Sequence, residues 1–399
     1  MGTEIQYGVL SKVSLKYVLN TLNFSDMNTC YINYRLLQYS RKDLDDILTV
    51  MMYQDSSSDE DSSDSDDDLD LLFLETLFPT PEASCTPRLK LEDLSDTQCQ
   101  QMFRFEKQDL YRLRDALQVP ANYICSQGTK ATGLEGLLIM LRRLAYPNRW
   151  CDLQSLFGRS ESELSLIFNE VIDDIYESHH HLIDALDLVW LDPQTFSQAI
   201  HAKGAPLDQC WGFIDGTPRP IARPIRSQRI MYSGHKRVHC LKFQSVQAPN
   251  GLIAHLFGPI EGRRHDAFML GESGLADKLR PLQRPNGEPY VIYGDPAYGL
   301  TRNILAPFRG AQLTHDQQEF NRRMSKLRVA VEWGFGKICQ QFAFLDFKKN
   351  MKVLLQPVGK YYVVAALLTN CHTCLYNSQT GRYFELYPPS LEDYLSNTR

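Results

Sequence analysis

The sequence has no long apolar run and no cysteine spacing typical of a disulfide framework. No stretch reaches the roughly 20 apolar residues that a membrane-spanning helix needs. The N-terminus lacks the basic-then-apolar pattern of a secretion signal. Ten cysteines are scattered over the 399 residues, which suits reduced thiols better than disulfides. We therefore expect a soluble, intracellular protein without membrane association.

One short segment contains no basic residues, and its negative charge hides the positive net charge of the remaining residues. Residues 55–70 hold nine acidic residues and no Lys or Arg, whereas the whole chain has a formal net charge of −6. Leaving this segment out gives the remainder a net charge of +3. Self-repulsion and the scarcity of apolar residues predict that the segment is disordered. A mildly basic remainder is compatible with nucleic-acid binding but does not establish it.

Composition and periodicity divide the chain into five segments. Residues 1–54 are expected to be partly helical, and residues 55–84 to form an acidic, Ser/Asp-rich linker. Residues 85–200 have helical periodicity, and residues 201–390 alternate strand and helix patterns before a final apolar helix. Residues 391–399 form a short tail.

The helical segment has the outline of a helix-turn-helix unit. One helix is predicted up to Phe157, and the next begins at Glu161, where Ser160 and Glu163 form a capping box. This second helix carries six acidic residues and no Lys or Arg, so that phosphates would repel it. We interpret the unit as helix-turn-helix-like packing. Any DNA contact would come from nearby arginines: Arg142, Arg143, Arg149 or Arg159.

Two aspartates follow apolar runs rich in β-branched and aromatic residues. Asp215 comes after WGFI, and Asp295 comes after YVIYG. Such runs predict buried strands, and a carboxylate at the end of a buried strand is costly unless it is paired, protonated or bound to a metal. For Asp215 alone, followed by Gly-Thr-Pro, a turn aspartate is the more common explanation. Two neighbouring strands would bring both carboxylates together and favour a cation between them.

A third acidic residue lies on a predicted helix. From Thr314 to Phe344 there is no proline, the only glycines are Gly334 and Gly336, and apolar residues recur at helical spacing. Glu332 lies beside this apolar stripe. Two strand carboxylates and one helix carboxylate make an oxygen-rich set, which hard divalent cations prefer.

Four motifs in order, IDGT, GRRHD, GDPAY and VEW-FG, resemble the DDE nuclease of the PIF/Harbinger transposase superfamily and its domesticated descendants in animals. The resemblance covers roughly residues 100–390. In that family two aspartates and a glutamate bind the catalytic metals, and here they fall on Asp215, Asp295 and Glu332. Many relatives have Ser-Gly after the second aspartate, where this chain has Pro296-Ala297, a change that leaves the carboxylate in place.

The order of the predicted elements matches an α/β, ribonuclease H-like fold. The strand with Asp215 precedes two strands joined at Asn250-Gly251, a helix, the strand with Asp295, a short extended run and the Glu332 helix. We therefore predict a mixed five-stranded sheet with flanking helices, preceded by an all-α, helix-turn-helix-like domain.

The resemblance implies a metal-dependent DNA endonuclease that hydrolyses phosphodiester bonds, or transfers strands, with two Mg²⁺ or Mn²⁺ ions. Asp266 would then orient a metal ligand or bind the metal, or else cap the following helix, and His265 would support the site. The alternatives are a domesticated, catalytically silent DNA- or chromatin-associated protein with the same fold, and a phosphodiesterase acting on RNA.

A basic loop leaves directly from Asp215. Residues 218–237 contain no acidic residue, and Tyr232 and His235 are interleaved among the basic ones. We expect this loop to contact the DNA backbone. With the arginines of the GRRHD motif, the predicted DNA-binding set is Arg219, Arg223, Arg226, Arg229, Lys236, Arg237, Arg263 and Arg264. The resemblance also implies a Myb-like DNA-binding partner protein and a nuclear location, with the cytoplasm as a second compartment.

Overall fold

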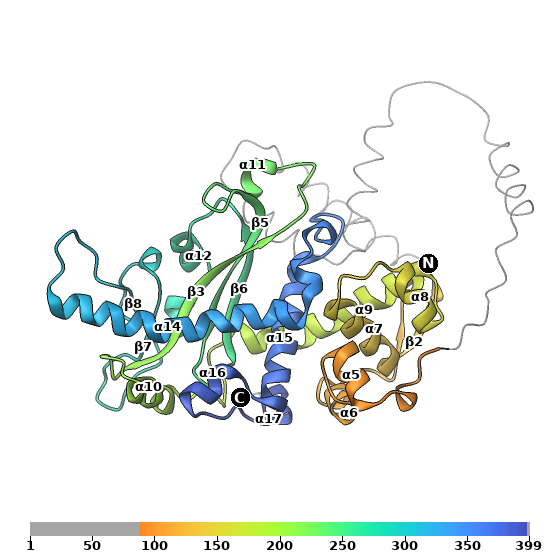
Figure 1. The fold of residues 1–399 in the computed structure, drawn as a ribbon, viewed down its shortest axis with the longest axis horizontal. Coiled ribbons are helices and arrows are strands. Elements are labelled where there is room, and N and C mark those ends of the chain that lie inside the picture. The colour runs from red at the N-terminus through yellow and green to blue at the C-terminus, as the bar shows by residue number, and fades with distance from the viewer. Residues whose placement is uncertain (1–87, 397–399) are drawn as a thin grey trace, which may run out of the picture.

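The computed structural model describes residues 88–396, except for the side chains of residues 330–335. The predicted helical segment 1–54 and the acidic linker 55–84 lie outside the described residues. In Figure 1 a twisted sheet crossed by a long helix lies beside a group of helices, and one helix stands between the two parts.

The first described part consists of helices around a small hairpin. Its elements are η1 (Leu91–Asp93), α5 (Asp96–Phe103), α6 (Lys107–Ala116), β1 (Asn122–Ile124), η2 (Ser126–Gly128), β2 (Lys130–Thr132), α7 (Gly133–Ala145), α8 (Cys151–Phe157), α9 (Glu161–His179) and η3 (His180–Ile183). The predicted capping box of Ser160 and Glu163 begins α9. The prediction of an all-α part is wrong, because β1 and β2 pair antiparallel. Burial of Tyr123, whose hydroxyl donates to Asp174 at 2.7 Å, holds this hairpin against α9.

A six-stranded mixed sheet forms the second part. Its strands are β3 (Cys210–Pro220), β4 (Tyr232–Ser233), β5 (Val238–Gln247), β6 (Ile253–Glu261), β7 (Val291–Tyr293) and β8 (Ile304–Leu305). The order is β4-β5-β3-β7-β8, with β6 also paired to β5. We predicted five strands, and the additional one is the two-residue β4, which pairs with the start of β5 where β6 has ended. This mixed α/β arrangement is compatible with a ribonuclease H-like fold.

The central strand β3 continues past its parallel neighbour. The pairing of β3 with β7 ends at Phe213 and Tyr293. The antiparallel pairing with β5 continues from Phe213 to Pro220. Beyond Phe213, β3 therefore has a strand on one side only, within the part of the chain that the structure describes.

Helices cover both faces of the sheet. They are α10 (Pro193–Ala202), α11 (Gln228–Met231), α12 (Asp266–Glu272), α13 (Leu275–Leu279), η4 (Pro296–Tyr298), α14 (His315–Gln341), η5 (Ala343–Asp346), η6 (Lys348–Asn350), α15 (Val358–Tyr376), α16 (Gln379–Phe384) and α17 (Leu391–Leu395). On one face α13 packs against Trp211 and Ile214 of β3. On the other face Met324 and Leu327 of α14 pack against Phe213. The tail predicted from residue 391 begins instead with α17, in which Leu391 and Tyr394 are buried.

Helix α15 joins the two parts of the molecule. It is apolar on all sides and buried along most of its length, as expected for a helix in the middle of a core. Toward α9, the Tyr361 hydroxyl donates to Asn169 at 2.8 Å. Toward β6, the Asn370 side chain bonds both the N–H and the carbonyl of Ile253 at 2.9 Å. Among the described residues, no helix is long and apolar enough to span a membrane.

Candidate active site

Asp215 and Asp295 lie at matched positions on neighbouring parallel strands. Each lies two residues beyond Phe213 and Tyr293, the last pair of the β3–β7 ladder. Gly294 makes this close approach feasible, because a Cβ there would stand 2.6 Å from the Ile214 side chain. The pairing of the two strands therefore places both aspartates at the same end of the sheet.

The two aspartates are held differently. Asp215 is 20% exposed, and its Oδ1 lies 3.3 Å from Nη1 of Arg328, which comes from α14. Asp295 precedes η4, and its Oδ1 accepts a hydrogen bond from the Ala297 N–H at 2.9 Å. Asp215 thus lies beside a cation, whereas Asp295 caps a short helix with one oxygen.

Asp266 joins this group of carboxylates. It is the first residue of α12, and the N-cap position belongs to His265, an exposed residue without a side-chain cap hydrogen bond. The alternative in which Asp266 caps the helix is therefore wrong. Its Oδ1 lies 3.3 Å from Nζ of Lys242 on β5, and 3.1 Å from where a Cβ on Gly216 would stand.

The hydroxyl of Tyr298 lies among these carboxylates. Tyr298 is 4% exposed, and its oxygen would stand 3.2 Å from a Cβ on Gly216, directly after Asp215. Within the described residues this buried hydroxyl has no hydrogen-bond partner. Burial raises the pKa of the Tyr298 phenol well above its ordinary value, and the charges of Asp266, Asp215 and Asp295 raise it further. The phenol therefore stays protonated.

Glu332 lies on α14 as predicted, and the capping box of Thr314 and Gln317 begins that helix. Its side chain is outside the described residues. Arg328 precedes Glu332 by four residues, so that the two positions share one face of the helix. Since Arg328 reaches Asp215 from this face, the helix backbone brings the position of Glu332 to the same side of the sheet.

The oxygen atoms of the described residues are of the kind that a divalent cation prefers, but their side chains are not assembled around one metal position. No three His, Cys, Asp or Glu side chains among those described come close enough together to hold a metal. The carboxylates of Asp215 and Asp266 are neutralised by Arg328 and Lys242. Carboxylate oxygens suit Mg²⁺ or Mn²⁺, and such an ion would relieve the same repulsion that the two cations relieve here.

Three residues of this site were missed in the sequence analysis. Lys242 is the only Lys, Arg, Asp or Glu in β5, most of which is buried, and this marks it as unusual. Tyr298 ends the GDPAY motif, and Arg328 lies one helical turn before the predicted glutamate. None of these signals shows which carboxylate the side chain contacts.

The predicted DNA-binding residues separate into an exposed group and an inward group. The exposed residues are Arg223, Arg226, Arg229, Lys236, Arg237 and Arg263. The two segments that supply them are adjacent, because the N–H of Arg263 donates to the carbonyl of Ile230 at 3.0 Å. Arg264 is partly buried, with its guanidinium 4.2 Å from the Phe268 ring centre.

Arg219 belongs to the interior. We predicted a loop from residue 218, but β3 extends to Pro220 through its pairing with β5. Arg219 is 15% exposed, bonds the Tyr362 hydroxyl at 3.2 Å and lies 3.5 Å from Asp346. Its guanidinium therefore ties β3 to the chain after α14.

Two arginines of the helical part are also committed to internal contacts. Arg143 is 4% exposed and lies between Trp150 and Phe344, with its guanidinium 4.2 and 4.5 Å from the two ring centres. Arg159 is paired with Glu135 at 2.6 Å. These two of the four arginines offered as DNA contacts are therefore unavailable at the surface.

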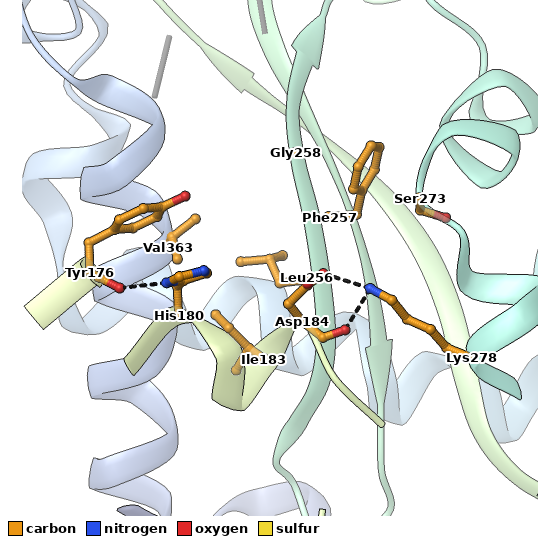
Figure 2. Close-up of a pocket in the computed structure, with 10 residues that line it drawn as sticks. All are labelled: Tyr176, His180, Ile183, Asp184, Leu256, Phe257, Gly258, Ser273, Lys278 and Val363. Carbon is orange, nitrogen blue, oxygen red and sulfur yellow. Dashed lines mark hydrogen bonds and ion pairs between the residues drawn. The ribbon is translucent and has the colours of Figure 1, made fainter. Parts of the chain in front are cut away.

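A separate cavity of about 320 Å³ lies between η3, β6 and α13 (Figure 2). Its polar groups bond one another: Lys278 donates to the carboxylate and carbonyl of Asp184 at 2.7 and 2.8 Å, and His180 bonds the carbonyl of Tyr176 at 2.9 Å. None of the site carboxylates lines this cavity.

The sheet thus places Asp215 and Asp295 beyond the ends of adjacent parallel strands, and the position of Glu332 lies on helix α14. Residues 214–370 match the family described as DDE superfamily endonuclease. This region includes Asp215, Asp295 and Glu332.

Two curated relatives share this region. The chain is 24% identical over 240 residues to Protein ALP1-like of Arabidopsis thaliana, covering 57% of this chain and 57% of that protein. It is 31% identical over 121 residues to a probable transposase for insertion sequence element IS702 of Microchaete diplosiphon, covering 30% of this chain and 42% of that protein. The chain thus spans about half the length of these curated relatives. No solved structure matches the chain.

Proposed function

We propose that this protein is a metal-dependent DNA endonuclease of the PIF/Harbinger transposase type with a ribonuclease H-like nuclease domain. One observation carries the proposal: Asp215 and Asp295 lie two residues beyond the last pair of two adjacent parallel strands. The match to the DDE superfamily endonucleases and the transposase among the relatives support it. The reaction is hydrolysis of a phosphodiester bond, with strand transfer as its variant.

Asp215, Asp295 and Glu332 would hold two Mg²⁺ or Mn²⁺ ions. Bound there, the ions supply a water of lowered pKa and stabilise the oxygen that leaves in an in-line displacement. Arg328 and Lys242 reduce the negative charge that an approaching phosphodiester meets. Lys242 also fixes Asp266, because its ammonium group donates to the carbonyl of Arg264 at 2.7 Å and thereby anchors the start of α12.

Tyr298 would bind the substrate directly. Its hydroxyl is a buried donor without an acceptor among the described residues, located between the carboxylates where the scissile phosphate would bind. An unsatisfied buried polar group costs about 1–3 kcal/mol in the free protein. A non-bridging phosphate oxygen would accept this hydrogen bond, so that the cost is recovered only in the complex.

DNA would lie across the exposed basic residues of the loop before β5 and of the turn before α12. These side chains contact phosphates and fix the position of the duplex without reading its sequence. Because the helical part uses Arg143 and Arg159 in its interior, sequence recognition would come from a Myb-like partner protein. A nuclear location follows from the same proposal.

A nicking assay tests this function. Purified protein is incubated with supercoiled plasmid and with a duplex RNA, in Mg²⁺, in Mn²⁺ or in EDTA. We expect metal-dependent nicking of DNA that Asp295→Asn abolishes. Asp277→Asn is the matched control, because Asp277 is exposed and pairs only with a surface arginine among the described residues, at 2.6 Å. Cleavage of RNA alone would favour the RNA phosphodiesterase, and binding of DNA without nicking would favour the catalytically silent protein.

A further inference from the structure

The chain between α14 and α15 has a run of basic residues without acidic ones. Residues 347–355, which we call the lysine–leucine loop, have the sequence FKKNMKVLL. Lys348, Lys349 and Lys352 are exposed, whereas Met351 and Val353 are 2% and 8% exposed and anchor the loop in the core. The lysines are therefore presented from a fixed backbone, which distinguishes them from lysines on a mobile tail.

The same loop exposes large apolar side chains. Phe347, Leu354 and Leu355 are 41%, 37% and 54% exposed. Leu354 also has a φ of 75°, a left-handed conformation that is unfavourable for leucine and is more often found at functional positions. The exposed Leu354 and Leu355, which follow the three lysines, gain nothing from exposure in the free protein. Together with the lysines they match the chemistry of a partner that is anionic outside and apolar inside.

The loop lies against the proposed DNA surface. The N–H of Ala222 donates to the carbonyl of Met351 at 3.0 Å, which places the loop beside the exposed Arg223. Arg219 lies 3.5 Å from Asp346, the residue directly before the loop, and is four residues beyond Asp215 on β3. At about 3.3 Å per strand residue, the loop begins roughly 13 Å from Asp215 along this strand. That distance corresponds to about four nucleotide steps of 3.4 Å.

We propose that the lysine–leucine loop is a second DNA-binding element of this protein. Lys348, Lys349 and Lys352 contact phosphates about four steps from the scissile bond. Leu354 and Leu355 press on the base steps between those phosphates and unstack them, as apolar side chains do in the minor groove. The inference rests on the proposed function for its substrate, but its tests measure binding in metal-free buffer, so that its failure and the failure of cleavage are distinguishable.

The lysines are tested by the salt dependence of binding. Fluorescence anisotropy with a 30-base-pair duplex in EDTA compares wild type with Lys348→Ala/Lys349→Ala/Lys352→Ala at about 50–200 mM KCl. We expect weaker binding and a log Kd against log salt slope reduced by about two to three. The control Lys90→Ala/Lys130→Ala/Arg280→Ala removes three charges from other exposed positions and should leave the slope unchanged. A wild-type slope in the loop variant would overturn the proposal.

The leucines are tested by a variant that keeps the backbone conformation. Leu354→Asn suits a left-handed φ, so that the unfolding temperature should not fall. A duplex with 2-aminopurine at successive positions should brighten when wild type unstacks it, and Leu354→Asn should remove this signal and leave the salt slope intact. Ile124→Asn, at an apolar residue 68% exposed on β1, is the control. A wild-type 2-aminopurine signal in Leu354→Asn would overturn the role of Leu354.

Discussion

Two arginine–carboxylate clusters in this molecule differ in how deeply they are buried and how closely their charges are paired. In the helical part, Arg159 is 2% exposed and lies 2.6 Å from Glu135 and 3.2 Å from Glu163. It also donates to the carbonyl of Lys130 at 2.7 Å. In the candidate active site, Arg328 is 24% exposed and approaches Asp215 at 3.3 Å. The first cluster is closed and strongly hydrogen-bonded, whereas the second is longer and open to water.

The difference separates an arginine cluster buried within the fold from one that lies partly exposed in the candidate site. Arg159 donates hydrogen bonds to a backbone carbonyl and to side-chain carboxylates, so that its charge serves to hold the fold together. Near Arg328, the buried Tyr298 hydroxyl has no hydrogen-bond partner among the described residues and feels the charges of Asp215, Asp266 and Asp295, an arrangement that a protein selected only for stability would not keep. We therefore expect substitutions in the first cluster to cost stability and those in the second to cost function.

The sharpest test of this contrast is Asp295→Asn. Asparagine keeps the shape and the cap of η4 but removes a charge and a metal ligand. Cleavage should fall at least about 10³-fold, which corresponds to about 4 kcal/mol of transition-state stabilisation. Without metal, the unfolding temperature should equal or exceed that of wild type, because repulsion between carboxylates decreases.

The same variant should also lose the rise in unfolding temperature that Mn²⁺ gives to wild type by binding the folded state. Asp215→Asn and Glu332→Gln are measured beside it, and Asp266→Asn is expected to be milder. If Asp295→Asn still cuts DNA, or keeps the full Mn²⁺-induced shift, then Asp295 is not a metal ligand.

Arg159→Ala should have the opposite profile. Removing a buried guanidinium leaves Glu135 without its partner in a partly buried site, which costs about 3 kcal/mol of unfolding free energy. Urea denaturation measures this loss, and nicking per folded molecule should be unchanged. Arg328→Ala, measured alongside, should cost much less stability. Equal losses in both variants would remove the distinction between the two clusters.

Tyr298→Phe should separate stability from function within one side chain. Losing a buried hydroxyl that has no partner should raise the free energy of unfolding by about 1 kcal/mol. Losing a hydrogen bond to the phosphate should lower cleavage by about 10- to 100-fold, or about 1–3 kcal/mol. Calorimetry and the nicking rate report the two effects. A destabilised variant would show that the hydroxyl already has a partner in the free protein, contrary to its proposed role.

The smallest expected effect is that of Arg223→Ala/Arg226→Ala. Both side chains are exposed, so that stability should stay within about 0.5 kcal/mol of wild type. Binding should weaken alike for all duplex sequences, with a salt slope reduced by about two. Anisotropy with two unrelated duplexes measures this. A loss confined to one sequence would mean base recognition instead of backbone contact.

Local patterns were sufficient to predict much of the fold. The capping signal at Ser160 predicted the start of α9, the proline-free run with helical spacing from Thr314 predicted α14, and Asn250-Gly251 predicted the hairpin of β5 and β6. The apolar runs before Asp215 and Asp295 gave two strands that the structure places side by side. In each of these cases the signal lies within the element itself.

What local patterns did not predict depends on contacts between distant segments. Three-residue strands such as β1 are too short for periodicity, and their burial against α9 decides them. The inward position of Arg219 follows from the length of the β3–β5 pairing, which two prolines in the sequence argued against. The approach of Arg328 to Asp215 joins residues 113 positions apart, and no pattern in the sequence gives that distance.

The stretch of β3 that continues past β7 has an open strand edge, within the described residues, and this edge favours aggregation. An open strand edge is a template on which another chain can add a strand, and such edges lead to aggregation. Pro218 and Pro220 lie in this stretch, paired with Lys242 and Cys240 of β5. A proline has no N–H to offer an incoming strand, so that these two residues remove donors from an edge that a nuclease must leave open for its substrate. Pro218 and Pro220 thus leave this open edge of β3 without two of the N–H donors that a second copy of the protein would need to pair with it.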